Sequence, residues 1–308
     1  MNDVDASTIN SLFSQAVSDP QELQKLSEAA GAFIRQKLRE VSFARKILPP
    51  VSVTKADCQR SEDHDGLVKI VDIEPDSKAM AINWRSEPDG KYVEGKRYTI
   101  PFSTISSEKF EKTEQELLAY EMPITRVIEE NSVKDIQKIE DLRFLQYIEA
   151  EIASSGLSGT VTDTTVTRAA LSQLAKLLPG KEVRLGTILM NEIDFADILA
   201  WEAKDIGGKI AAEITIDGYR YQSVLGYKLV TSIKRQTLSD GTDEGVVPAG
   251  TIYGFAEPQF LGNFFMLNQT KFWIDKRANM ISWQAWEDVG LGIGNINGAC
   301  KIELSQGS

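Results

Sequence analysis

The feature that most constrains this fold is a long, charge-rich run near the middle of the chain, residues 124–155. Apolar residues recur there at intervals of three or four, at Ile136, Ile139, Leu142, Leu145, Ile148 and Ile152. This spacing is typical of an amphipathic helix with one buried face and one solvent-exposed face. At about 1.5 Å per residue the helix would extend for about 45 Å, which is longer than a compact domain usually needs. The sequence therefore predicts a long structural helix along which other elements pack.

Composition limits the classes of protein that the chain can belong to. Its 308 residues suffice for one large domain or two of ordinary size. A hydrophobic fraction of 42% and a charged fraction of 26% are typical of a soluble globular protein. No apolar run approaches the roughly 18 residues of a membrane span, and the start MNDVDASTIN lacks the basic and apolar segments of a signal peptide. We therefore expect a protein that is made in the cytosol and has no membrane contact.

The charge balance is acidic. A formal net charge of −11 and a pI near 4.8 disfavour tight binding of nucleic acid through phosphate neutralisation. The nearest thing to a basic cluster lies near the end of the first predicted helix and comprises Arg35, Lys37, Arg39, Arg45 and Lys46. A solvent-exposed helix face is the simpler interpretation of this cluster, and a partner-binding patch is the alternative.

The N-terminal third predicts a helical arm followed by a long β-rich excursion. Residues 1–19 are polar and are predicted to be mobile. Asp19 and Pro20 predict the start of a helix, which Pro49 and its neighbouring proline would end. From residue 51 to about 107, short β-rich runs alternate with turn-rich stretches, which predicts a long hairpin. Because a two-stranded hairpin is at best marginally stable alone, we expect this one to rest on other structure, such as a neighbouring subunit.

The rest of the chain predicts an α/β unit followed by a β-rich end. The predicted elements are, in order, an acidic helical stretch over 107–120, the long helix, a linker over 156–163, a helix over 164–178, a buried strand over 185–191, a helix over 194–204 and a strand around 219–233. From residue 251 onward the sequence is β-like again. The fold class predicted from this order is α+β.

Taken together, these elements resemble the major capsid protein of tailed bacteriophages, which has the Hong Kong 97 type fold. The resemblance covers nearly the whole chain and rests on the order and texture of segments, because no invariant signature is present. The segments that carry it are ITRVIEENSVKDIQKIEDLRFLQYIEAEIASSG, ILMNEIDFADILAW, VLGYKLVTS, and the ending that runs from IYGFAEPQFLGNFFMLNQ to GNINGACKIEL.

The resemblance implies a specific organisation and function. The implied parts are an N-terminal arm (1–50), an extended loop (51–106), a peripheral domain with a spine helix (107–158), an axial α/β domain (159–248) and a return to the peripheral domain (249–308). Such a protein self-assembles through hexamers and pentamers into an icosahedral or prolate shell that encloses double-stranded DNA without sequence-specific binding. The implied partners are a scaffolding protein, a portal protein and, as a further candidate, a decoration or cement protein. The implied location is the virion, after assembly in the cytoplasm of a host bacterium.

Two properties of some family members are not expected here. The chain leaves no room before its arm for an N-terminal scaffolding extension, so a separate scaffolding protein or a processed product is expected. Some members also join subunits covalently through a lysine and an asparagine, assisted by a glutamate. Lys91 lies near the tip of the predicted loop, and Asn279, Asn295 and Asn297 lie in the tail, but no spacing selects them. We predict no such cross-link.

No motif in the sequence supports catalysis, a cofactor or a metal. The sole histidine, His64, lies in a polar turn six residues after Cys58, and adjacent side chains of such a turn point apart. The nucleophile elbow GxSxG is absent, and the string GLSG at 156–159 is one residue short of it. Neighbouring carboxylates such as Glu129 with Glu130 do not face each other on a helix, which predicts solvent-exposed charges. We therefore predict a protein that is not an enzyme.

Three further features have competing interpretations. Cys58 and Cys300 lie far apart without metal-binding spacing, so no disulfide framework is predicted. The glycine-rich stretch 290–298 misses the GxGxxG spacing, which favours tight packing or a β-bulge over nucleotide binding. Aromatic residues crowd the C-terminal segment, and we predict core packing for most of them and a subunit interface as the alternative: Phe260, Phe264, Phe265, Phe272, Trp273, Trp283 and Trp286.

Two rival functions remain open at this point. An encapsulin-like nanocompartment shell shares the capsid fold but holds cargo enzyme in place of a genome. An unrelated soluble enzyme or binding module with an α+β fold is the second rival.

Overall fold

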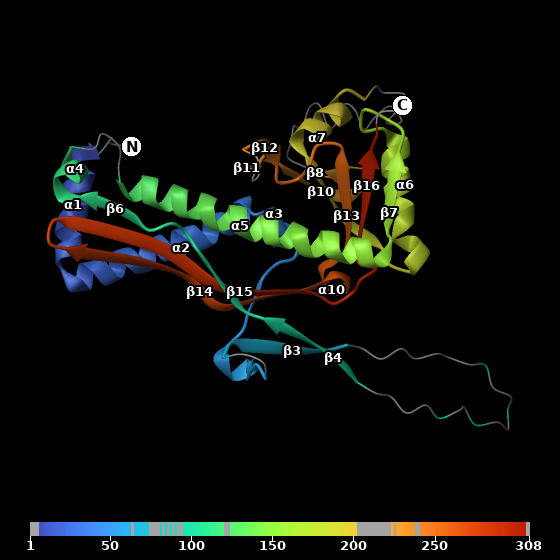
Figure 1. Cartoon of the computed structure of the whole chain (residues 1–308), viewed down its shortest axis with the longest axis horizontal. Helices are drawn as coiled ribbons and strands as arrows, with labels where there is room; N and C mark the ends of the chain where they lie inside the picture. Colours follow the sequence, from blue (N-terminus) through green and yellow to red (C-terminus); the bar gives the residue numbers. More distant parts are fainter. Residues whose placement is uncertain are drawn as a thin grey trace.

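The computed structural model describes residues 6–62, 65–73, 95–119, 124–201, 223–224, 226–237 and 241–305, together with residues 81, 84, 87 and 90. Its central element is helix α5 (Ile124–Ser155), which has the ends that the sequence predicts. The helix runs along a five-stranded sheet, and its C-terminal part reaches a six-stranded sheet (Figure 1). The long predicted helix thus joins the two main sheets of the molecule.

The five-stranded sheet is built around one long hairpin. Strands β14 (Gly262–Arg277) and β15 (Met280–Ile293) pair in antiparallel fashion along their length. The shorter strands β1 (Val51–Ser52), β5 (Ser103–Ser106) and β6 (Phe110–Thr113) flank this hairpin, β1 on β14 and the other two on β15. Side chains of the C-terminal aromatic group face the core from this hairpin and are buried, namely Phe264, Phe265, Phe272 and Trp283. Core packing of these four aromatics is confirmed, whereas Phe260 is exposed.

The six-stranded sheet combines the middle of the chain with its C-terminal end. Its strands, in spatial order, are β7 (Ser158–Val161), β16 (Ala299–Leu304), β13 (Thr251–Ala256), β8 (Leu185–Asn191), β10 (Tyr227–Ser232) and β9 (Ser223–Val224). Helices α6 (Arg168–Leu177) and α7 (Glu192–Leu199) share an apolar core with this sheet. A short 3-10 turn (Pro179–Lys181) follows α6, and a small hairpin of β11 (Arg235–Thr237) and β12 (Asp243–Gly245) follows β10. The predicted segment 249–308 therefore supplies strands to both sheets.

The N-terminal helices pack on the five-stranded sheet and on α5. They are α1 (Ala6–Ser18), α2 (Pro20–Val41) and α3 (Phe43–Ile47). The predicted mobility of residues 1–19 is wrong for the part that the structure describes, because α1 buries Phe13 and Val17. In addition, the side-chain amide of Asn10 donates a hydrogen bond of 3.2 Å to the carbonyl of Leu117. The start of α2 is as predicted, since the Asp19 carboxylate accepts a hydrogen bond from the amide of Gln21 at 2.9 Å.

A β-ribbon projects from the body below the five-stranded sheet (Figure 1). It consists of β2 (Gln59–Arg60), β3 (Leu67–Ile73) and β4 (Lys96–Pro101), after a 3-10 turn at Lys55–Asp57. The pairing of β3 with β4 confirms the base of the predicted hairpin. The run MAINWR and Lys91 lie largely or wholly outside the described residues, and so does His64.

Three local predictions need correction. Within the predicted helical stretch over 107–120, the described residues contain strand β6 and the short helix α4 (Glu114–Leu118), because the Thr113 and Glu116 side chains form a capping box that starts the helix late. The linker after α5 contains strand β7, whose backbone pairs with β16. Helix α7 ends at Leu199 instead of residue 204, and a short helix, α10 (Pro258–Leu261), leads into β14.

The apolar face of α5 is also narrower than the sequence predicts. Ile136, Ile148 and Ile152 are buried against the core, whereas Ile139 is 36% exposed. Ile139, which the sequence assigns to the buried face, therefore lies at the edge of that face and is partly in solvent. The opposite error occurs at Glu140 and Asp141, which are buried although a charged helix face is expected to be wet.

Candidate functional site

The most unusual arrangement of side chains in the described structure is a buried ionic cluster where α3, α5 and β15 meet. The Arg45 guanidinium donates to the Glu140 carboxylate from Nε at 2.9 Å and from Nη2 at 2.8 Å. The same Nη2 donates to Glu287 Oε1 at 2.7 Å. The three side chains are 1%, 3% and 0% exposed, respectively. This cluster, which we call the Arg45 cluster, joins α3 to the long helix α5, which we call the spine helix, and to β15 of the five-stranded sheet.

Asp141 and Ser42 complete the Arg45 cluster and fix the start of α3. Asp141 Oδ1 accepts hydrogen bonds from Ser42 Oγ at 2.8 Å and from the amide of Ala44 at 3.0 Å. The Ser42 hydroxyl also lies 3.1 Å from Glu140 Oε1 and accepts from the amide of Arg45. A carboxylate and a hydroxyl at a helix start are stabilising because they accept hydrogen bonds from free backbone amides. The sequence signal for this capping is the serine that directly precedes Phe43 and Ala44.

The electrostatics of the Arg45 cluster follow from burial. Burial raises the pKa of Glu140 to about 8, and the nearby charges of Glu287 and Asp141 act in the same direction, while Arg45 opposes them. Burial also raises the pKa of Asp141 to about 6, against the hydrogen bonds from Ala44, Ser42 and Gln137. The solvent-exposed interpretation of the basic segment is therefore wrong for Arg45, whose positive charge the core carboxylates require.

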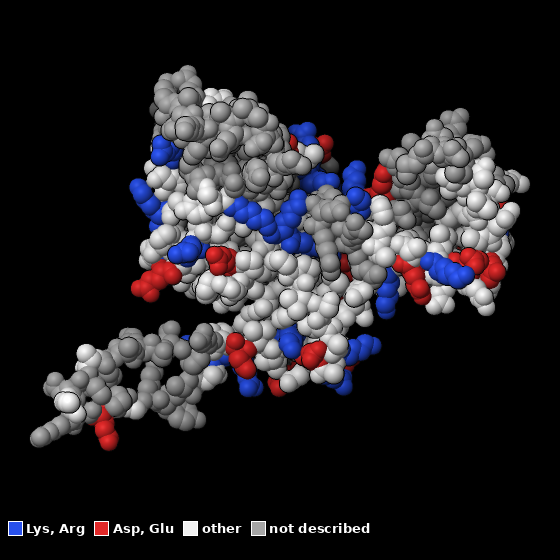
Figure 2. All heavy atoms as spheres, turned by 180° about the vertical axis from the view of Figure 1, so that it is seen from behind, with Lys and Arg blue, Asp and Glu red and all other residues white. Residues whose placement is uncertain are grey.

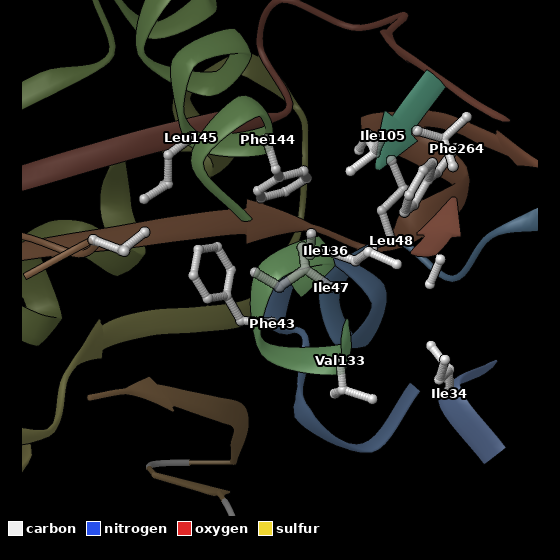
Figure 3. Close-up of a cluster of buried hydrophobic side chains, with 14 of the residues drawn as sticks. Ile34, Phe43, Ile47, Leu48, Ile105, Val133, Ile136, Phe144, Leu145 and Phe264 are labelled. Atoms are coloured by element: carbon white, nitrogen blue, oxygen red, sulfur yellow. The ribbon is translucent and has the colours of Figure 1, made fainter. Parts of the chain in front are cut away.

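An apolar core surrounds the Arg45 cluster and holds its backbone in place. Figure 3 shows Phe43 of α3 facing Phe144 of α5, with Ile47 and Ile136 beside them. The two phenylalanine rings meet edge to face, with centroids 6.2 Å apart and planes at 72°. Such pairs add a modest attraction to the burial of their surface. The ionic cluster therefore lies among large, rigid side chains.

The glycine-rich end of β15 forms a seat for the projecting ribbon. A Cβ atom built on Gly292 would lie 2.6 Å from side-chain atoms of Ile100, and one built on Gly294 would lie 2.7 Å from the Tyr98 hydroxyl. The Tyr98 hydroxyl accepts a hydrogen bond of 2.8 Å from the Asn263 side-chain amide. Since any side chain on these glycines would collide with β4, the predicted tight packing is confirmed. These contacts set the direction in which the ribbon leaves the body.

An apolar hollow of about 530 Å³ lies between the spine helix α5 and the edge of the five-stranded sheet at β5. Its apolar lining includes Ile105, Phe144, Phe264, Val289 and Leu291. Arg143 and Ser103 also line the hollow, and the Arg143 guanidinium donates a hydrogen bond of 2.6 Å to the Ser103 hydroxyl. Concave apolar surfaces of this size can accept a small molecule or the side chains of another chain.

A second polar contact ties α5 to the six-stranded sheet. The Tyr253 hydroxyl donates to Glu149 Oε1 at 2.6 Å, and the Lys301 ammonium lies 2.8 Å from Glu149 Oε2. The Lys301 ammonium also pairs with Glu303. Unlike the Arg45 cluster, this contact is partly open to solvent, because the Glu149 side chain is 39% exposed.

The other residues considered in the sequence are dispersed. Cys58 and Cys300 are both free thiols, and burial raises the pKa of Cys300 to about 12. Asn279 lies in the turn between β14 and β15, where its carbonyl accepts from the amide of Glu114. Asn295 donates to the carbonyl of Phe260 at 2.9 Å, and its side-chain oxygen accepts from the amide of Asn297. These asparagines therefore have ordinary turn contacts.

Neither a metal-binding group nor a membrane span is found in the part of the chain that the structure describes. No three His, Cys, Asp or Glu side chains there come together in a way that could hold a metal ion. None of the described helices is both long enough and apolar enough to cross a membrane.

Comparison with known proteins gives matches at the level of structure. No family model matches the sequence, and no curated protein matches it. A structure from Microbacterium phage Oxtober96 matches with a TM-score of 0.59 and 11% identity, over 86% of this chain and 91% of that one. The capsid of cyanophage P-SCSP1u matches with a TM-score of 0.52 and 10% identity, over 78% and 84%. A virus-like particle from Pyrococcus furiosus matches with a TM-score of 0.51 and 14% identity, over 91% and 99%.

These matches extend over most of each chain. At such low identity they establish the fold alone. They agree with the α+β class predicted from the sequence and with the resemblance on which that prediction rested. This chain has the fold of the phage capsid proteins.

Proposed function

We propose that this chain is a capsid shell protein that self-assembles into the icosahedral or prolate head of a tailed phage and encloses double-stranded DNA. The observation that supports this most is the shared fold over most of the chain, with a phage capsid among the matching structures. The role is structural and requires no turnover. The protein would reside in the virion after assembly in the cytoplasm of a host bacterium.

The projecting ribbon supports a role in assembly. A three-stranded ribbon outside the body has little surface of its own to bury, so a contact with another subunit would stabilise it. Specific protein interfaces commonly bury about 1,600 Å² in total, and a projecting element supplies such area without enlarging the body. Among the described strands, β2 and β4 are the two edges of the ribbon, and Lys96 and Arg97 lie on β4. Charged edge residues of this kind disfavour unwanted strand pairing.

The predicted division into domains is part of this proposal, with one refinement. The arm would comprise residues 1–50, the extended loop 51–106, the peripheral domain 107–158 and the axial domain 159–248. Within 249–308, the β14–β15 hairpin would belong to the peripheral domain, while β13 and β16 would belong to the axial domain, whose sheet they join.

The proposed partners are other copies of the chain in hexamers and pentamers, a scaffolding protein, a portal protein and, as a further candidate, a decoration or cement protein. DNA would be enclosed without sequence-specific binding. On the face in Figure 2, basic side chains gather across the middle of the body, while acidic side chains are scattered over it and over the ribbon. Together with the net charge of −11, this mixed surface favours weak, salt-screened contact with DNA.

Expression of the chain together with its scaffolding protein tests the proposal. We expect closed shells in negative-stain electron micrographs and elution in the void volume of a sizing column. A stable monomer of 34.2 kDa under the same conditions would contradict a shell function.

An encapsulin-like nanocompartment is the second candidate function. The match to a virus-like particle from Pyrococcus furiosus supports this second function. Native particles distinguish the two functions by their contents. Nuclease-resistant double-stranded DNA and a portal at one vertex would support a phage head, and an enclosed enzyme without DNA would support the nanocompartment.

A further inference from the structure

The Arg45 cluster contains more acidic groups than basic ones. Two carboxylates, those of Glu140 and Glu287, bind the Arg45 guanidinium, and a third, that of Asp141, binds the Ser42 hydroxyl beside them. All four charged side chains are buried. Among the described residues, the charged groups of the cluster come from three elements: Arg45 from α3, Glu140 and Asp141 from α5, and Glu287 from β15. Strand β14 adds a neutral group, the Thr270 hydroxyl, which donates a hydrogen bond of 2.9 Å to Glu287. Three negative charges against one positive charge are strongly unfavourable where water is excluded.

The hydrogen bonds show where a proton would relieve this imbalance. Ser42 Oγ lies 3.1 Å from Glu140 Oε1 and 2.8 Å from Asp141 Oδ1. A hydroxyl carries a single hydrogen, so it can donate to one of these two oxygens at a time. If both carboxyl groups were ionised, the other contact would place two oxygen lone pairs against each other. A proton on either carboxyl group turns this contact into a second hydrogen bond, which Ser42 accepts.

We propose that the Arg45 cluster is a proton-dependent lock, which holds α3 on the spine helix while it retains one proton and loosens α3 when that proton is lost. The lock does not depend on shell assembly, because all its members belong to one chain. Its effect would extend to the six-stranded sheet, since the Lys228 ammonium of β10 donates to the carbonyl of Lys46 at the end of α3, at 2.6 Å. Loosening α3 would therefore weaken the contact of the N-terminal helices with α5 and with β10 together.

The direction of the pH dependence follows from the acids involved. In the docked state the pKa of Glu140 rises from its ordinary value of 4.5 to about 8, and that of Asp141 from 3.8 to about 6, chiefly because of burial. The two carboxyl groups share one hydroxyl, so the proton belongs to the cluster and not to one residue. Docking of α3 is therefore most favourable below the ordinary pKa values, and this contribution is lost as the pH rises toward about 8.

Hydrogen–deuterium exchange of the full-length protein tests the lock. Protection of the amides of residues 42–48, corrected for intrinsic exchange, should fall between about pH 5.5 and about pH 8 by up to about tenfold per pH unit for each proton lost. Amides of the paired strands β8 and β13 serve as an internal reference and should keep their protection. Constant protection of residues 42–48 across this range, relative to the reference, would overturn the proposal.

The variant Glu140→Gln assigns the pH dependence to the Arg45 cluster. Glutamine keeps the shape of the side chain but cannot ionise, so the fall in protection of residues 42–48 should shrink or disappear. Glu151→Gln, on the same helix and outside the cluster, should retain the wild-type profile. A wild-type profile in Glu140→Gln would refute the lock. If that variant does not fold, Asp141→Asn, which keeps a capping oxygen for α3, is measured against the same prediction.

Discussion

Two of the polar contacts that join the spine helix to the rest of the molecule use the same kinds of residue in different surroundings. Near its middle, Glu140 meets Arg45 where both side chains are at most 3% exposed. Nearer its C-terminal end, Glu149 meets Lys301 where the side chains are 39% and 19% exposed. Burying an ion pair costs desolvation free energy, and removing one partner of a buried pair costs still more, because the other charge is left buried alone. Around an exposed pair both costs are small, because water solvates the separated charges. Burial, and not the identity of the charges, decides which contact the fold depends on.

Removal of the buried cation is the strongest test of this comparison. Arg45→Ala leaves the carboxylates of Glu140 and Glu287 without their cation, so we expect a loss of about 3–5 kcal/mol in the free energy of unfolding. Urea unfolding followed by circular dichroism measures the change. Lys46→Ala is the matched control one residue away and should change stability by less than about 0.5 kcal/mol through its side chain. A loss below about 1 kcal/mol for Arg45→Ala would show that the cluster is not structurally important.

The apolar side of the spine helix offers a second comparison, between Ile148 at 0% and Ile139 at 36% exposure. Ile148→Ala removes buried methylene groups and leaves a cavity, for which we expect a loss of about 2–5 kcal/mol. Ile139→Ala should cost clearly less, because water already reaches that side chain. Equal losses in urea unfolding would mean that the helix is rotated relative to its position in this structure.

The glycines of β15 that contact β4 allow the direction of the ribbon to be tested apart from the stability of the body. Gly292→Ala places a methyl group within 2.6 Å of the buried Ile100 side chain of β4, which must shift, and we expect a cost of about 1–3 kcal/mol. The ribbon should then leave the body in another direction, and the yield of shells in electron micrographs should fall more than the yield of soluble protein. Gly159→Ala is the control, since its nearest contact would be an ordinary 3.7 Å. Normal shells from Gly292→Ala would show that the seat does not guide assembly.

The residues that matter most in these tests differ in how visible they are in the sequence. The long helix was predicted with its correct ends because a periodic apolar pattern is a local property, and Gly290–Gly298 pointed to close packing for a similar reason. The amphipathic pattern of α1, with Phe13 and Val17 one turn apart, was present but was outweighed by the polar residues around it. The burial of Arg45, Glu140 and Glu287 could not be predicted, because three segments far apart in sequence bring these charges together.

The exposed contact at the end of the spine helix should give the smallest effect. Lys301→Ala removes both ion pairs of this lysine, yet the partners Glu149 and Glu303 can be hydrated, so we expect a loss of at most about 1 kcal/mol. Because salt screens exposed charges over about 8 Å at physiological ionic strength, the difference from the wild type should shrink further when the salt concentration is raised. Arg45→Ala should show no such relief, since salt does not reach a buried pair. Unfolding curves of both variants at low and high salt therefore test the difference in burial through the salt dependence of the stability loss. A salt-insensitive loss for Lys301→Ala would mean that the two contacts do not differ as their exposure indicates.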